Sequence, residues 1–172
     1  TNKGDINVDL DVSKGGILSA MDGFTGTLVN EGDIDIKLAS NSTNKAFTVS
    51  ALSMSSGTAM NKGNISVDLT GETKNGSSFY AIRPTGVGDV TVSNEGKITV
   101  NSNMDNFDLF ALASGLGLTN NQKSGEIYLT TSGENSSLNG TYTVVDGTKA
   151  KGAKNLGKLV LTHNGGRTNF PR

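Results

Sequence analysis

Few side chains in this sequence have the type and spacing that catalysis or metal binding requires. His163 is the only histidine, and there is no cysteine, which excludes zinc–thiolate sites, paired-histidine sites and thiol nucleophiles. His163 has no acidic neighbour at ligand spacing, and no Gly-x-Ser-x-Gly motif accompanies it. We interpret His163 as a structural residue and assign no catalytic, metal-binding or cofactor-binding residue to the chain.

Acidic residues recur at the start of the chain, where a regular pattern could gather them on one face: Asp5, Asp9, Asp11, Asp33 and Asp35. If the repeats described below stack, Asp5 lies beside Asp33, and a hard cation such as Ca²⁺ could relieve the repulsion. The Gly-Gly-x-Gly-x-Asp nonapeptide of calcium-binding β-helices is absent. A solvated outer face, partly balanced by Lys3 and Lys37, is the simpler interpretation.

Arg83, with Asp89 nearby in the sequence, is a third candidate. Polysaccharide lyases built on β-helices need clustered acidic ligands and a basic residue in one groove. A single arginine beside Pro84 more simply predicts a turn with a salt bridge.

A short phrase, Asn-x-Gly-x-Ile-x-Val-x-Leu, repeats along the chain and must position all of these candidates. Its copies, the last three of them shortened or altered, occupy residues 2–10, 30–38, 61–69, 94–100, 125–129 and 155–161. Each copy alternates apolar and polar residues, the pattern of a strand with one buried face. Because similar strands recur only every ~30 residues, parallel pairing between copies is expected.

Two further apolar runs separate successive phrases. The second run of each repeat falls at residues 17–21, 48–52, 79–82, 109–112 and 143–145, and the third at 27–29, 58–60, 90–92 and 117–119. Residues 104–114 also match a helical pattern, but the repeat places a strand there. The sequence therefore predicts an all-β, right-handed parallel β-helix over residues 1–172, a single domain of about five to six coils of ~28–33 residues, with three strands per coil.

Stacking the phrases predicts three inward columns. The first contains Ile6, Ile34, Ile65, Ile98, Ile127 and Leu159; the second contains Val8, Ile36, Val67, Val100, Leu129 and Leu161. The third begins with Leu10, Leu38 and Leu69 and then becomes polar at Ser102, Thr131 and His163. Because Lys123 also replaces the asparagine of the fifth copy, we expect the wall to weaken toward the C-terminus.

The Asn-x-Gly pair marks a corner before each strand. Glycine and asparagine tolerate the positive φ values that sharp bends require, and stacked asparagines can hydrogen-bond along a column. Residues 37–46, 71–78 and 132–140 are rich in Ser, Thr, Asn and Gly, and we expect them to be loops that leave the coil.

Composition adds limits on partners. The formal net charge is −1, so no attraction to nucleic acid or to anionic membranes is expected. No apolar run reaches the ~20 residues of a membrane-spanning helix. The start of the chain is acidic and its end is basic, with Lys149, Lys151, Lys154, Lys158, Arg167 and Arg172, which predicts weak head-to-tail contacts between molecules.

Corners of the Asn-x-Gly type, followed by Ile-x-Val-x-Leu and by ~20 variable Ser, Thr, Gly and Asn residues, resemble the passenger domains of Gram-negative autotransporters. The resemblance covers essentially the whole chain and implies export across the outer membrane to the bacterial cell surface or medium. No protease subdomain with its serine motif is present, and we expect no enzymatic activity and no cofactor. The chain is then expected to be a fragment of a longer passenger.

Two classes of function remain open. One is adhesion or cell–cell aggregation, in which the segment binds a host surface protein or glycan, or the same protein on another cell, or serves as the stalk or spacer of an adhesive tip. The alternative is a carbohydrate-active β-helix, a polysaccharide lyase or a phage tailspike fragment. A lyase should show a groove with three or more carboxylates and an Arg or Lys.

Overall fold

The computed structural model describes residues 1–74, 76–86, 88–143 and 151–165, and every regular element in these ranges is a β-strand. The strands form three parallel sheets that run the length of the molecule. Sheet 1 contains β1 (Ile6–Val12), β4 (Ile34–Ser42), β7 (Asn64–Thr73), β10 (Lys97–Ser102), β13 (Glu126–Thr131) and β16 (Lys158–His163).

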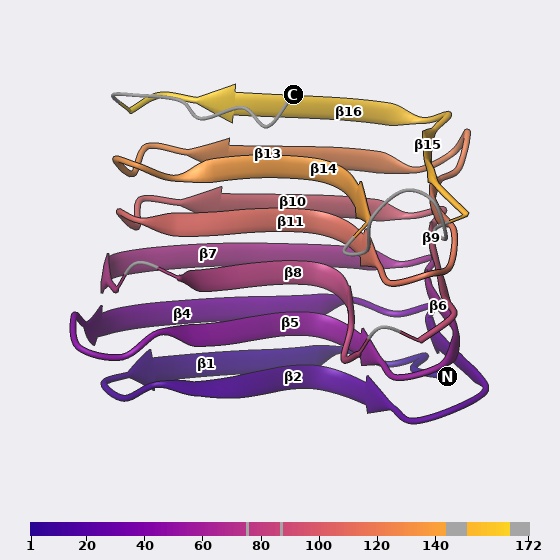
Figure 1. Cartoon of the computed structure of the whole chain (residues 1–172), viewed down its shortest axis with the longest axis horizontal. Helices are drawn as coiled ribbons and strands as arrows, with labels where there is room; N and C mark the ends of the chain where they lie inside the picture. The colour runs from indigo at the N-terminus through magenta and orange to yellow at the C-terminus, as the bar shows by residue number, and fades with distance from the viewer. Residues whose placement is uncertain (75, 87, 144–150, 166–172) are drawn as a thin grey trace.

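The chain passes from each strand of sheet 1 to sheet 2, then to sheet 3, and returns to sheet 1 one layer higher (Figure 1). Sheet 2 contains β2 (Gly16–Gly23), β5 (Phe47–Met54), β8 (Ser77–Pro84), β11 (Phe107–Ser114) and β14 (Ser137–Thr143). Sheet 3 contains β3 (Thr27–Asn30), β6 (Gly57–Asn61), β9 (Val90–Asn94), β12 (Thr119–Asn121) and β15 (Ala153–Asn155). This arrangement confirms the predicted all-β parallel β-helix with three strands per coil.

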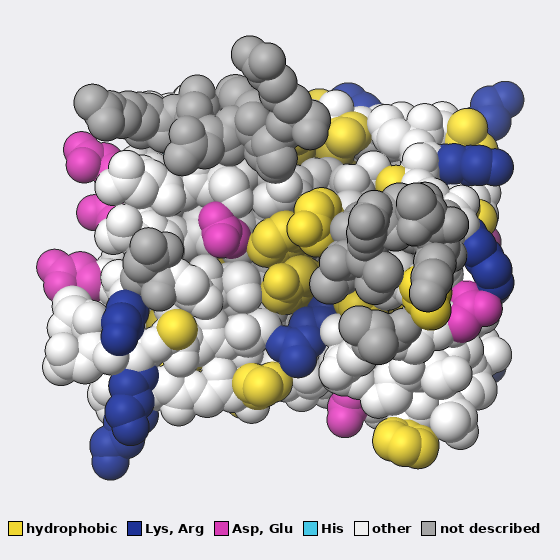
Figure 2. Space-filling view, in the orientation of Figure 1, with side chains coloured by type: hydrophobic (Ala, Val, Ile, Leu, Met, Phe, Trp, Pro, Cys, Tyr) yellow, Lys and Arg dark blue, Asp and Glu magenta, His cyan; other side chains and the backbone are white. Residues whose placement is uncertain are grey.

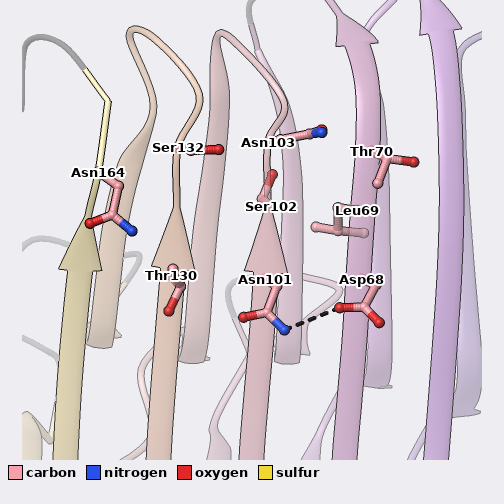
Figure 3. Close-up of a pocket in the computed structure, with 9 residues that line it drawn as sticks. All are labelled: Asp68, Leu69, Thr70, Asn101, Ser102, Asn103, Thr130, Ser132 and Asn164. Carbon is pink, nitrogen blue, oxygen red and sulfur yellow. Dashed lines mark hydrogen bonds between the residues drawn. The ribbon is translucent and has the colours of Figure 1, made fainter.

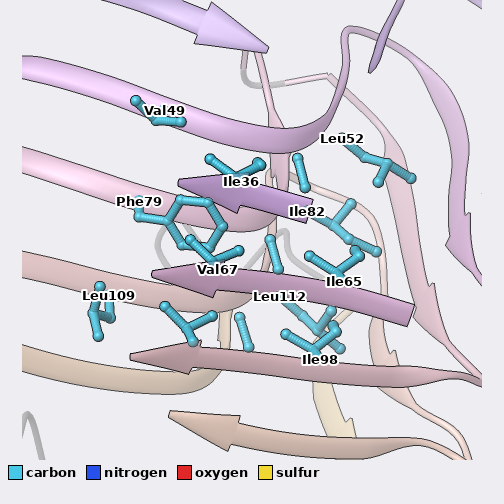
Figure 4. Packing of buried hydrophobic residues seen from close by; sticks show 14 of the residues in the cluster. Ile36, Val49, Leu52, Ile65, Val67, Phe79, Ile82, Ile98, Leu109 and Leu112 are labelled. Atoms are coloured by element: carbon cyan, nitrogen blue, oxygen red, sulfur yellow. The ribbon is translucent and has the colours of Figure 1, made fainter. Parts of the chain in front are cut away.

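The two apolar columns of sheet 1 are confirmed by its register. Ile34 pairs with Ile65, and Ile36 with Val67; the same pairing continues upward to Leu159 and Leu161. Ile98, Val100, Ile127 and Leu129 have no exposed surface, so the wall does not weaken at the fifth copy. Figure 4 shows Ile36, Val67 and Ile98 of these columns in the core that they share with Val49, Phe79 and Leu109 of sheet 2.

Several predicted boundaries in the loops are wrong. Residues 37–42, expected in a loop, belong to β4. In the fifth coil the second strand is Ser137–Thr143, not residues 143–145, because Leu138 stacks on Leu109 in the inward column of sheet 2; residues 144 and 145 lie outside the described ranges. In the fourth coil the third strand is Thr119–Asn121, not residues 117–119. The helical alternative for residues 104–114 is wrong, because β11 occupies residues 107–114 as a strand.

The predicted asparagine ladder is confirmed and is longer than expected. Each side-chain amide nitrogen donates to the next asparagine oxygen, at 2.8–2.9 Å, in the order Asn2, Asn30, Asn61, Asn94, Asn121 and Asn155. The fifth rung is Asn121, two residues before the Lys123 that interrupts the repeat. The Asn121 amide still reaches the carbonyl oxygen of Gly125 at 3.3 Å, so the extra residues are accommodated without loss of the ladder.

The reason predicted for the corner glycines is wrong. Positive φ values occur at Gly26, Gly57, Gly71, Gly76 and Gly152, and the glycines of the Asn-x-Gly corners are not in this set. Their role is close approach: a Cβ on Gly63 would overlap the carbonyl oxygen of Gly32, and a Cβ on Gly96 would overlap that of Gly63. From the second coil onward the corners stack backbone on backbone, with no room for a side chain.

No described residues form a helix that is long and apolar enough to cross a membrane.

Candidate functional site

Each polar residue in the third column of sheet 1 forms a turn with the two residues that follow it. The backbone N–H of Met104 donates to the Ser102 hydroxyl, and that of Gly133 donates to the Thr131 hydroxyl, both at 3.1 Å. At the next level Gly165 N–H donates to Nδ1 of His163 at 3.3 Å. The polar side chain accepts a hydrogen bond from the backbone two residues ahead, just beyond the end of the strand, which gives His163 a structural part in the last of these turns.

Leucine at the same position lets the strand continue. With Leu38 and Leu69, β4 and β7 run for 9 and 10 residues, whereas β10, β13 and β16 have 6. A hollow lies on the surface of sheet 1 where β10, β13 and β16 end beside β7. The substitution of leucine by Ser, Thr and His in the repeat thus shapes the surface as well as the core.

The hollow is a groove of about 520 Å³ that crosses four neighbouring strands (Figure 3). We call it the end groove. It is lined by Asp68, Leu69, Thr70, Asn101, Ser102, Asn103, Thr130, Ser132 and Asn164. Because it crosses the strands, its long direction follows the axis of the β-helix.

Amide and hydroxyl groups dominate the chemistry of the end groove. Asn101 Nδ2 donates to Asp68 Oδ1 at 3.1 Å, and Gly71 N–H donates to Asn103 Oδ1 at 3.0 Å. These bonds leave the Asn103 amide nitrogen and the Asn101 oxygen available. Asp68 is the one charged residue among the residues of the lining.

A second hollow lies on the same face toward the N-terminus. It has a volume of about 300 Å³ and is lined by Asn7, Asp35, Ile36, Lys37, Ser66 and Asp68. It contains two carboxylates and one lysine, and the end groove contains one carboxylate. Neither described hollow holds the three carboxylates with a basic residue that the lyase hypothesis requires.

Outward aromatic residues form a column on sheet 2. The Tyr80 and Phe110 rings stack at 4.5 Å with planes 7° apart, and Tyr142 lies 5.3 Å from Phe110 at 54°. The Arg83 guanidinium lies 5.8 Å from the Tyr80 ring centroid. Figure 2 shows hydrophobic side chains gathered near the middle of the face on which sheet 2 lies in front of sheet 1.

The Tyr80 and Phe110 rings of this column are half-buried, whereas Tyr142 is exposed. The Tyr80 ring is in contact with Arg83 and Phe110, and burial raises the pKa of the Tyr80 phenol. On sheet 1 the Tyr128 ring has Lys97 and Lys158 at 5.4 and 4.9 Å from its centroid. The interaction with the Tyr128 hydroxyl raises the pKa of Lys158. Both clusters are best explained as stabilising ladders.

The residues singled out in the sequence are not brought together into one site. Arg83 lies at the Tyr80 ring, while Asp89 forms an ion pair with Lys151 at 2.7 Å, so the predicted local salt bridge is wrong, although the chain does bend after Pro84. Asp5 and Asp33 do lie on adjacent coils, because Ile6 pairs with Ile34. Asp33 also accepts a hydrogen bond from Asn64 at 2.8 Å, and no described residues form a group of three or more acidic or histidine side chains that could hold a metal ion.

Comparison of the chain with protein-family models, with curated proteins and with solved structures finds no significant similarity. The end groove cannot be recognised in the sequence from Ser102, Thr131 and His163 alone, because the loss of leucine at these positions equally predicts a weaker wall. The useful signal was the polar residue that follows each of them by one position: Asn103, Ser132 and Asn164.

Proposed function

We propose that this chain is a surface-displayed segment of a bacterial β-helix protein of the autotransporter-passenger kind, exported across the outer membrane, and that it acts in adhesion or cell–cell aggregation. The end groove is the observation that carries this proposal. It is a polar surface that extends across four strands and so suits an extended partner better than a small substrate.

The fold supports the same proposal. Residues of the inward columns and of the asparagine ladder are occupied by stacking, which leaves recognition to outward residues and loops. The partner is then a host surface protein or glycan, or the same protein on another cell. Because the chain's net charge is −1, nucleic acid is a poor partner.

The ends of the molecule suggest an additional contact between copies. Extending the register of sheet 1 by one strand places Lys158 of one copy beside Asp5 of the next, and Leu159 beside Ile6. Asn155 then donates to Asn2, as each rung donates to the next within the chain. This head-to-tail association is weak, because the charged pair is exposed.

Display on a bacterial surface tests the adhesive function. The chain is fused to an export signal and an outer-membrane β-barrel carrier, and adhesion to host cells and sedimentation of the culture are compared with those of the carrier alone. We expect both to rise, and protease treatment of intact cells should abolish the gain. Adhesion and sedimentation equal to those of the carrier would contradict the proposal.

A variant separates binding from a stalk role. Ser132→Arg places a long side chain in the end groove at an exposed position. We expect adhesion to fall while surface display is unchanged. Adhesion that is insensitive to Ser132→Arg, but that depends on a domain attached beyond the chain, would identify the segment as a stalk.

A further inference from the structure

The position and lining of the end groove define the kind of molecule that it can hold. Its polar groups come from the ends of neighbouring strands, so equivalent side chains recur at the strand spacing of about 4.8 Å. Asn103 follows β10, Ser132 follows β13 and Asn164 follows β16. A ligand that lies along the groove meets one such group per coil.

The available groups are both donors and acceptors. Within the described part of the chain, no hydrogen bond engages the side chains of Thr130, Ser132 or Asn164. Asn103 has its oxygen bound to Gly71 N–H, which directs the amide nitrogen elsewhere as a donor. Asn101 has the opposite arrangement, because its nitrogen is bound to Asp68 and its oxygen can accept. Such mixed, closely spaced groups match a row of hydroxyls, each of which donates and accepts.

A peptide is a weaker match. An added peptide strand needs an open sheet edge, and the groove lies across the face of sheet 1, where β7, β10 and β13 are paired on both sides and β16 alone has an open edge. Other peptide and protein partners use apolar anchors, and the one apolar side chain of the lining, Leu69, is buried.

The charge of the groove lining narrows the class of ligand further. Asp68 is exposed and is the one charged residue in the lining. A uronate or sulfate would be repelled by Asp68 and would find no Lys or Arg among the lining residues.

We propose that the end groove binds a neutral glycan chain that lies along the axis of the β-helix, with about one sugar ring per coil. This inference rests on the proposed adhesive function and assigns a ligand class to its site. Hydroxyls of successive rings contact Asn103, Ser132 and Asn164 in turn, and Asp68 excludes acidic chains.

The test is a titration of the whole chain with three neutral hexasaccharides and one acidic hexasaccharide. Calorimetry measures binding, and NMR of the asparagine side-chain amides locates it. The neutral probes are the β-1,4-linked glucose, β-1,4-linked N-acetylglucosamine and α-1,4-linked glucose hexamers, and the acidic probe is the β-1,4-linked glucuronate hexamer. We expect at least one neutral probe to bind and to shift the Asn103 and Asn164 amides, and the glucuronate not to bind. Binding of glucuronate alone, or of no neutral probe, would overturn the proposal.

Variants locate the site and test the charge argument. Asn103→Ala and Asn164→Ala should each weaken binding about 5-fold, the loss of roughly one hydrogen bond. Asn41→Ala, at an exposed position of β4 outside the groove, is the matched control and should bind as the wild type does. Asp68→Lys should allow the glucuronate hexamer to bind. Circular dichroism confirms that each variant is folded.

The result of the glycan titration can be distinguished from the result of the display experiment. If displayed cells adhere and Ser132→Arg abolishes adhesion, but no neutral probe binds, the ligand class is wrong and the adhesive role stands. If a neutral probe binds the chain but displayed cells do not adhere, the glycan site stands and the adhesive role is wrong. Cleavage of a hexasaccharide during the titration would overturn simple binding and support the carbohydrate-active alternative.

Discussion

The corner glycines are needed because successive corners touch through their backbones. A Cβ on Gly63 would overlap the carbonyl oxygen of Gly32, whereas a Cβ on Gly4, the same position of the first coil, meets nothing within 4 Å. Gly63→Ala should therefore lower the free energy of unfolding by about 2 kcal/mol or more through overpacking. Gly4→Ala should change it by less than about 0.5 kcal/mol. Urea unfolding measures both, and equal effects would show that conformational freedom, not space, requires glycine.

The buried side-chain amides of the asparagine ladder need hydrogen-bond partners on the coils above and below. Asn61 donates to the Gly63 carbonyl and to Asn94, and accepts from Asn30, each at 2.9 Å. Asn61→Ala removes three hydrogen bonds and leaves buried groups without partners, so it should cost about 2–4 kcal/mol. Asn2→Ala, at the partly exposed start of the ladder, should cost about 1 kcal/mol by urea unfolding. A cost for Asn61→Ala no larger than that for Asn2→Ala would contradict the role given to the ladder.

Within a strand, alternation decides which positions tolerate charge. Val67 has 1% of its surface exposed, and Ser66 beside it points outward on β7. Val67→Lys buries an unpaired ammonium and should unfold the chain or cost at least about 4 kcal/mol. Ser66→Lys, whose neighbour in the register is Asp35, should be close to neutral. Thermal unfolding followed by circular dichroism distinguishes the two, and similar melting temperatures would refute the assigned register.

Strands that carry the repeat could be predicted from the sequence, since alternation and stacking fix which residues face inward. The boundaries between them could not, because the chain can turn wherever a hydroxyl or imidazole accepts a hydrogen bond from the backbone two residues ahead. Ser102 and Thr131 are such residues. In the sequence alone they appear only as polar replacements of Leu38 and Leu69 in the third inward column. The end groove depends on these turns, so it was hidden for the same reason.

Loops obscured the fifth coil in a similar way. Its asparagine rung is Asn121, four residues before Gly125 rather than two, and its second strand is anchored by Leu138. Both positions are defined by what lies one coil below, at Asn94 and Leu109. A local motif search cannot find them, because the partner that fixes them is ~30 residues away.

At the scale of the whole molecule, the two ends differ in charge, and β16 of one copy can align with β1 of the next in the register of sheet 1. Inward residues of the first coil, including Ile6 and Val8, are only partly buried, so a second copy seated there would cover apolar surface. We expect concentrated protein to associate at low salt and to dissociate at high salt, since the Debye length falls from about 30 Å at 0.01 M to about 3 Å at 1 M. Sedimentation velocity measures the change.

Reversal of one charge tests the arrangement of the copies. Lys158→Glu would place a carboxylate beside Asp5 of the next copy and should abolish the low-salt association. Lys97→Glu changes the same outward column inside the stack and should leave it intact. If both variants associate like the wild type, or if the wild type stays monomeric at low salt, head-to-tail contact does not occur.

Successive rungs of the asparagine ladder are separated by 28, 31, 33, 27 and 34 residues, yet each meets the next at almost the same distance. The ladder therefore resets the alignment once per coil, and length differences accumulated in a loop do not pass to the strands that follow. Loops of this molecule can gain or lose residues through insertion and deletion while the coils above remain in place. The β-helix is thus a modular support on which surface segments can diversify independently of one another.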